Sequence, residues 1–242
     1  ALPYFPIEEA NPFLGWRGIR VTLDHPEIIL AQVRAMMKAS DGLGNLRILL
    51  PMVSNVPELE EALALLRRSH RELVEDGLDE PMPQVGVMVE VPSAVYQARA
   101  LARRVEFLSV GSNDLPQYLL AVDRNNARVS DLYHAFHPAV FEALAQVADG
   151  ARAEGKGVSI CGELAGNPMA AVVLLAMGYE VLSMNATSLP RVKRALRAIT
   201  AADARAVWSE VRCLDSGDEI QERLRGFLRD RDLHEIVPAP ID

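Results

Sequence analysis

Polar side chains stand at the ends of three successive apolar runs that we predict to be β-strands. Glu90 ends the first run, Asn113 and Asp114 end the second, and residues 161–163 (Cys-Gly-Glu) end the third. Carboxylates, amides and thiols are groups that bind ligands and transfer protons in enzyme sites. Because a barrel presents its active site at the carboxyl ends of its parallel strands, this placement indicates a site at one face of such a fold.

The elements that would position these side chains alternate between strands and helices. The predicted strands span residues 17–21, 46–52, 84–90, 107–113, 157–163 and 181–185. Several are near-continuous apolar runs, typical of parallel strands covered on both faces. The predicted helices span residues 57–76, 92–104, 138–154, 168–177, 190–197, 201–212 and 217–229. Asp24 and Glu27 look like a capping box after the first strand, and Asn167 looks like an N-cap before Pro168.

This alternation is compatible with a doubly wound sheet or with a (β/α)₈ barrel. The sequence has no GxGxxG motif after a strand and no GxxxxGK[ST] motif, the phosphate-binding signatures of doubly wound folds. We therefore predict an α/β fold of the (β/α)₈ TIM-barrel type. One domain would span residues 1–242, with residues 201–242 as its closing helices and C-terminal tail.

The composition excludes several classes of protein. The chain has 25 Lys and Arg against 33 Asp and Glu, a net charge of −8 that argues against binding nucleic acid. No run approaches 18 apolar residues, so we expect no membrane span, and the acidic, proline-containing N-terminus is unlike a signal peptide. Two cysteines, Cys161 and Cys213, are too few for a disulfide framework and are typical of a cytoplasmic protein.

A family resemblance is carried by residues 106–124, whose sequence is EFLSVGSNDLPQYLLAVDR. This segment resembles the C-terminal signature of the phosphoenolpyruvate-utilising enzymes. Three more segments match that family in the same order: residues 11–20 (NPFLGWRGIR), 87–92 (VMVEVP) and 161–166 (CGELAG). The resemblance extends from residue 11 to about residue 197. Within the family it is strongest to the enzyme I branch, and residues 18–27 are similar to the nitrogen-related paralogue of that branch.

The resemblance implies a barrel domain that binds phosphoenolpyruvate and Mg²⁺. In this family the phosphoryl group passes to a histidine on a separate domain and then to a small carrier protein, and pyruvate is released. None of the five histidines lies in a Gly-rich Thr-Ser-His stretch like that of the acceptor domain; they are His25, His70, His134, His137 and His234. We therefore expect the acceptor domain and the carrier as partners, a homodimer, and no phosphotransferase activity of this chain alone.

The resemblance also assigns roles to the charged residues. Glu90 and Asp114 match the family's Mg²⁺ ligands, and Mn²⁺ would suit the same oxygens. Arg17 and Arg124 match its phosphate-binding arginines, since a guanidinium can bind phosphate oxygens with two hydrogen bonds. Each residue also has a simpler interpretation. The carboxylates could be solvated or salt-bridged, and Arg124 could form a surface ion pair with Asp123.

The remaining matched residues are an amide and a thiol. Asn113 would position substrate oxygens, although it could also be an ordinary turn residue. Cys161 matches the family's general acid, which protonates the enolate of pyruvate and needs a pKa near neutral to work in both directions. The alternative is a buried core cysteine. Glu163 could hold the thiol or a neighbouring arginine. Cys213 lies outside every motif, so we expect Cys161 to be the more reactive thiol.

The sequence departs from the family in three respects. The family barrel has eight strands, and we count six. The two family strands that precede the matched region carry two further arginines, so we expect weak phosphoenolpyruvate binding and open sheet edges at residues 17–21 and 181–185. Pro116 replaces a threonine. Two alternatives to the phosphotransferase remain: a non-catalytic dimerisation module, and a stand-alone Mg²⁺-dependent lyase or aldolase acting on pyruvate or phosphoenolpyruvate.

Overall fold

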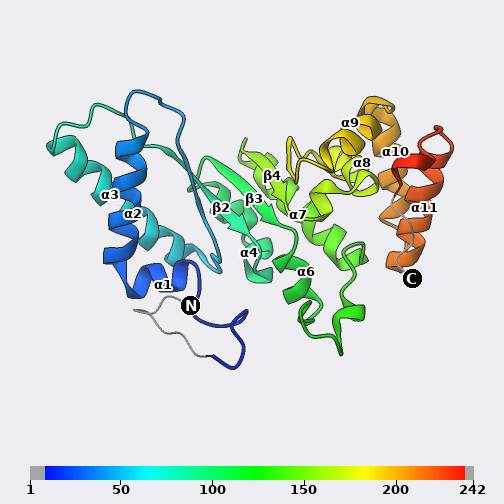
Figure 1. Ribbon diagram of the computed structural model, residues 1–242, viewed down its shortest axis with the longest axis horizontal. Coiled ribbons are helices and arrows are strands. Elements are labelled where there is room, and N and C mark those ends of the chain that lie inside the picture. The colour runs from blue at the N-terminus through cyan, green and yellow to red at the C-terminus, as the bar shows by residue number, and fades with distance from the viewer. Residues whose placement is uncertain (1–8, 238–242) are drawn as a thin grey trace.

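A parallel β-sheet forms the centre of the computed structural model, which describes residues 9–237 (Figure 1). Within these residues the sheet has five strands in the order β1-β2-β3-β4-β5, and every neighbouring pair is parallel. The strands are β1 (Arg47–Leu50), β2 (Gln84–Val89), β3 (Phe107–Gly111), β4 (Gly157–Cys161) and β5 (Val181–Ser183). The sheet stays open, with β1 and β5 at its edges. The sequential order of parallel strands joined by helices is the order of a (β/α) barrel.

Helices follow each strand and cover the sheet, as Figure 1 shows. The N-terminal helices are α1 (Ile19–Asp24), α2 (Pro26–Ala39) and α3 (Val56–Glu75). The central ones are α4 (Pro92–Tyr96), α5 (Ala98–Ala102), α6 (Asp114–Leu119) and α7 (Pro138–Ala153). The C-terminal ones are α8 (Pro168–Met177), α9 (Leu189–Arg197), α10 (Ala201–Val211) and α11 (Gly217–Arg229). Short 3₁₀ turns lie at η1 (Ser130–Leu132), η2 (Leu164–Gly166) and η3 (His234–Ile236). No helix in residues 9–237 is long and apolar enough to cross a membrane.

Local sequence explains where most helices begin. The Asn167 side chain accepts hydrogen bonds from the backbone N–H groups of Met169 and Ala170, which confirms the predicted cap of α8. Thr200 and Ser216 form capping boxes at the starts of α10 and α11. The predicted helix over residues 92–104 is divided, because α4 ends before Gln97 and α5 begins after it.

The strand predicted over residues 17–21 is wrong. Gly18 has a φ of 60°, which interrupts an extended backbone, and α1 begins directly after it. The N–H of Ile19 donates to Pro51 O, so this segment caps the end of β1 instead of extending the sheet. The predicted capping box is wrong as well. Asp24 is the last residue of α1, and its carboxylate accepts a hydrogen bond from Trp16 Nε1. The sheet edge predicted at residues 17–21 is therefore formed by β1.

The strand register brings the carboxyl ends of β2, β3 and β4 side by side. Val89 is paired with Val110, and Gly111 is paired with Cys161. Glu90 follows β2 directly, Asp114 follows β3 at the start of α6, and Cys161 is the last residue of β4. The three predicted groups therefore lie together at the carboxyl end of the sheet.

Candidate functional site

Two buried carboxylates form the centre of the candidate site. The exposed fraction is 4% for Glu90 and 8% for Asp114. Glu90 Oε1 accepts a hydrogen bond of 2.8 Å from the backbone N–H of Met52, which lies beyond β1. Gly111 lies beside Glu90, and a Cβ atom there would lie 2.8 Å from Glu90 Oε2. Any larger residue at position 111 would therefore overlap the Glu90 carboxylate.

The environment of Glu90 favours its neutral form. The pKa of Glu90 is raised to about 7, mainly by burial and also by the nearby negative charge of Asp114, while the Met52 N–H and the Arg17 guanidinium act to lower it. At neutral pH this carboxyl group is therefore about half protonated. A buried carboxyl group with a raised pKa beside a second carboxylate is typical of functional sites.

Two arginines converge on Asp114. Arg17 Nη2 lies 3.2 Å from Asp114 Oδ2, and Arg124 Nη1 lies 2.8 Å from Asp114 Oδ1. The ring of Phe13 lies near both guanidinium groups, with centroid distances of 5.7 Å to Arg17 and 5.6 Å to Arg124. Asp123, the alternative partner of Arg124, accepts instead from the N–H of Asn125. The structure thus brings both predicted phosphate-binding arginines to the predicted metal ligands.

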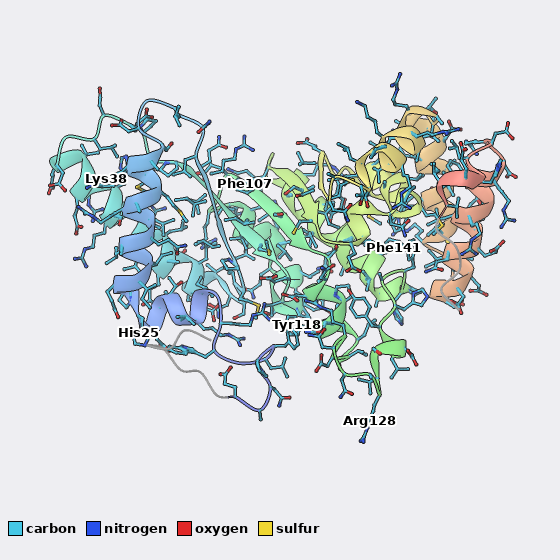
Figure 2. The ribbon with its side chains drawn as sticks, in the orientation of Figure 1. His25, Lys38, Phe107, Tyr118, Arg128 and Phe141 are labelled. Carbon is cyan, nitrogen blue, oxygen red and sulfur yellow. The ribbon has the colours of Figure 1, made fainter. Side chains whose placement is uncertain are left out.

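Two side chains of α6 anchor the segments that carry the two arginines. Gln117 Oε1 accepts a hydrogen bond of 3.2 Å from the backbone N–H of Arg124. Tyr118 Oη donates to the backbone oxygen of Phe13 and lies 3.5 Å from Arg17 Nη1. Figure 2 shows Tyr118 between α6 and the N-terminal loop. Sequence reasoning missed these positioning residues, although both lie inside the matched segment 106–124.

Asn113 joins the loops after β3 and β4. Its side-chain oxygen accepts a hydrogen bond of 3.0 Å from the backbone N–H of Glu163, and Tyr133 Oη donates to its backbone oxygen at 3.2 Å. The side-chain amide oxygen thus holds the loops after β3 and β4 together. Glu163 takes part through its backbone, and its carboxylate is exposed.

Cys161 is half-buried, with its Sγ 3.5 Å from the backbone oxygen of Val110. Burial raises the pKa of the Cys161 thiol, and the negative charges of Glu90 and Asp114 raise it further. The expectation of a pKa near neutral is therefore wrong for the protein without ligands. The thiol stays protonated. Cys213 is exposed beyond the end of α10, away from these elements.

Unsatisfied polar atoms gather at the same place. Within the described residues, four buried side-chain atoms lack a hydrogen-bond partner, and three of them are Asp114 Oδ1, Gln117 Nε2 and Arg124 Nη1. Asp114 Oδ1 and Arg124 Nη1 form a close ion pair that is not aligned as a hydrogen bond. Buried polar atoms are nearly always satisfied in folded proteins, so this concentration indicates a site built to bind charged groups.

The carboxylate oxygens of the site could supply some of the ligands of a hard divalent cation. No cluster of three or more His, Cys, Asp or Glu side chains with metal-binding geometry occurs in residues 9–237. Glu90 and Asp114 offer two carboxylates, and Mg²⁺ commonly takes one or two protein carboxylates and fills its remaining positions with water and substrate oxygens. The two carboxylates therefore fit Mg²⁺ with additional oxygens supplied from outside this chain.

The histidines lie apart from this cluster. His70 Nε2 contacts the backbone oxygen of Glu80, and His134 Nε2 contacts the Asp218 carboxylate. His137 Nδ1 accepts from the N–H of Ala139 at the start of α7. These contacts are structural.

The open sheet of parallel strands, with its charged groups at the carboxyl ends, defines a barrel-type ligand-binding domain. Residues 1–201 match the family described as PEP-utilising enzyme, PEP-binding domain, and the chain belongs to this family. A "Phosphoenolpyruvate-dependent phosphotransferase system" protein of Escherichia coli K12 is 47% identical over 237 residues, which cover 98% of this chain and 32% of that protein. A phosphoenolpyruvate-protein phosphotransferase of Haemophilus influenzae is 44% identical, covering 94% of this chain and 40% of that protein. The chain thus spans 32% to 40% of the length of these relatives.

Solved structures support the fold alone. A citrate lyase of Burkholderia xenovorans LB400 superposes with a TM-score of 0.52 at 21% sequence identity, covering 86% of this chain and 70% of that one. This likeness confirms the predicted α/β fold of TIM-barrel type. At this level of identity it carries no argument about substrate or reaction.

Proposed function

We propose that this chain is the phosphoenolpyruvate-binding domain of a phosphoenolpyruvate-protein phosphotransferase of the enzyme I type. The observation that carries the proposal is the convergence of Arg17 and Arg124 on Asp114 beside Glu90. Phosphoenolpyruvate carries a phosphate and a carboxylate, so its site needs several cations. Two guanidinium groups that already face one point are placed to bind such an anion together.

The site residues have separate roles in this proposal. Arg17 and Arg124 bind the phosphate oxygens, and the Nδ2 group of Asn113 donates to a substrate oxygen while its Oδ1 holds the Glu163 N–H. Glu90 and Asp114 hold Mg²⁺, or Mn²⁺ in its place. The cation would neutralise charge on the phosphate and on the enolate oxygen. Binding of substrate and cation would separate Asp114 from the two arginines, since each finds a more highly charged partner.

Cys161 acts as the proton donor. When the phosphoryl group leaves, the bond between phosphorus and the enol oxygen breaks, and its electron pair remains on the enolate of pyruvate. The methylene carbon of that enolate then takes the thiol proton and becomes the methyl group of pyruvate. The raised pKa of Cys161 supports this direction because it keeps the thiol protonated until the enolate forms.

The acceptor of the phosphoryl group is a histidine outside this chain, on a separate domain of the whole enzyme, and a small carrier protein receives the group next. We propose a homodimer in the whole enzyme. We also propose that it is the nitrogen-related paralogue, an assignment supported by residues 18–27. The chain alone would bind phosphoenolpyruvate without transferring its phosphoryl group to itself.

Calorimetry of phosphoenolpyruvate binding in the presence of Mg²⁺ tests the proposal. Arg124→Gln should weaken binding by roughly tenfold or more, because a charge-assisted hydrogen bond to phosphate is lost. Arg128→Gln is the matched control, since Arg128 projects away from the body of the molecule (Figure 2). Equal affinity of the Arg124 variant and the parent would overturn the proposal. Absence of binding in the parent would favour the non-catalytic dimerisation module, and aldol or lyase turnover would favour the lyase alternative.

A further inference from the structure

A pocket of about 480 Å³ lies beside the candidate site, lined by residues of the N-terminal loop and of α6. Apolar side chains dominate its wall, among them Phe13, Leu14, Met52, Val91 and Val122. Arg17, Glu90, Asp114, Arg124 and Cys161 do not line it. A concave apolar space of this size, with a few polar groups at its rim, is typical of small-molecule sites.

The rim carries one cation that has donors to spare. Arg20 lines the pocket, and its Nη1 atom donates to the backbone oxygens of Leu14 and Gly15. No hydrogen bond is made by its Nε or Nη2 atom among the described residues. Tyr118 lines the same pocket as Arg20. Asp123 adds one exposed carboxylate at the rim.

The two walls of the pocket are the two segments that present the arginines of the candidate site. One wall is formed by residues 10–14, three residues before Arg17, and the other by residues 117–123, directly before Arg124. Ala121, within the second wall, has a φ of 55°, which a residue with a side chain seldom adopts. A strained turn of this kind is common in segments that respond to a ligand.

We propose that this pocket is a second binding site, separate from the phosphoenolpyruvate site, for small carboxylic acids with a compact apolar body. The body packs between the Phe13–Leu14 wall and Val122, and the carboxylate binds the free donors of Arg20. A bound acid contacts both arginine-bearing segments at once and therefore influences the spacing of Arg17 and Arg124. That influence on phosphoenolpyruvate rests on the proposed function, whereas binding in the pocket does not.

The test uses phenylacetate as the probe and 2-phenylethanol as a neutral probe of similar shape. Labelled methionine methyl groups report the location by NMR, because Met52 lines the pocket and the sulfur of Met88 lies against Gly111 in the carboxylate site. Phenylacetate should shift the Met52 methyl resonance saturably and bind roughly fivefold more tightly than 2-phenylethanol, as one partly exposed charge pair allows. A saturable response of Met88 without one of Met52 would place the acid at the arginine pair and overturn the proposal.

Two pairs of variants locate the contacts. Arg20→Gln should abolish the preference for phenylacetate over 2-phenylethanol, and Arg128→Gln should keep it. Leu14→Trp should block both probes by filling the pocket, whereas Leu132→Trp should not, although both leucines are 67% exposed. The Leu14 variant keeps the proposal testable if Arg20→Gln perturbs the loop. Unchanged binding in Leu14→Trp, or an unchanged preference in a folded Arg20→Gln variant, would overturn it.

Discussion

Arg124 Nη1 and Asp114 Oδ1 lie 2.8 Å apart at the carboxyl end of β3, although neither atom makes an aligned hydrogen bond there. Arg17 binds the other oxygen of the same carboxylate. In the protein without ligands, Asp114 therefore takes the place that an anion would occupy between the two arginines. In the proposed function, this arrangement would link metal binding, anion binding and the protonation of Glu90.

Mg²⁺ binding should depend on both buried carboxylates. We expect Glu90→Gln and Asp114→Asn each to weaken Mg²⁺ binding by at least tenfold in calorimetry, because each removes one of two charged oxygen ligands. Asp131→Asn is the control, since Asp131 is exposed on η1. Unchanged affinity in both buried variants, with measurable binding in the parent, would contradict the assignment.

The stability of the metal-free protein should fall as pH rises through neutrality. The pKa of Glu90 is about 7 in the folded protein and about 4.5 in an exposed chain, so the folded state binds more protons between these values. The free energy of unfolding should therefore decrease from pH 5 to pH 8 by about 2.5 kcal/mol from this group.

Urea unfolding of Glu90→Gln at several pH values checks this dependence. In this variant the free energy of unfolding should change little between pH 5 and pH 8, because the neutral amide carries no charge at either pH. Glu142→Gln, an exposed site on α7, should keep the parental profile. A parental slope in Glu90→Gln would show that another group titrates.

Cys161 should react slowly with alkylating agents at neutral pH. Its raised pKa keeps the thiol protonated, and the thiolate is the reactive form. In the ligand-free protein we therefore expect the exposed Cys213 to be alkylated first, which reverses the order predicted from sequence. Glu90→Gln should shift the alkylation profile of Cys161 to lower pH, because the charge of Glu90 contributes to the raised pKa. Site-resolved mass spectrometry across pH measures both effects, and faster alkylation of Cys161 in the parent would contradict them.

Gly162→Ala should disrupt the loop that holds Asn113. Gly162 has a φ of 101°, and an added Cβ atom would lie 2.5 Å from Ser112 Oγ and 2.7 Å from Asn113 Oδ1. We expect a loss of about 2–4 kcal/mol in the free energy of unfolding, measured in urea, from strain and from this overlap. Gly155→Ala is the matched control, because Gly155 also has a positive φ but no atom within 4 Å of the added Cβ. Gly155→Ala should lower the free energy of unfolding by only about 1 kcal/mol. Equal losses in the two variants would show that the loop relieves the overlap at Gly162.

Much of the fold could be predicted because local patterns and long-range contacts agree. The apolar runs at residues 84–90, 107–113 and 157–163 contain strands β2, β3 and β4 of the parallel sheet. The helix starts at Asn167 and Thr200 follow from side chains that cap their own backbone. The position of the candidate residues could also be predicted, because the carboxyl ends of parallel strands lie on the same side of a sheet.

The sequence by itself thus determined the type of fold, the face that carries the site and the residue types available there. Tertiary structure alone decided the conformation of residues 17–21. Their β-branched side chains favour a strand, but Gly18 and the bond from Ile19 to Pro51 turn the chain into α1. It also decided that two arginines separated by more than a hundred residues meet on Asp114, and that the Cys161 thiol is protonated. Ion pairing and pKa depend on distance and burial in three dimensions, and residue spacing along a chain specifies neither.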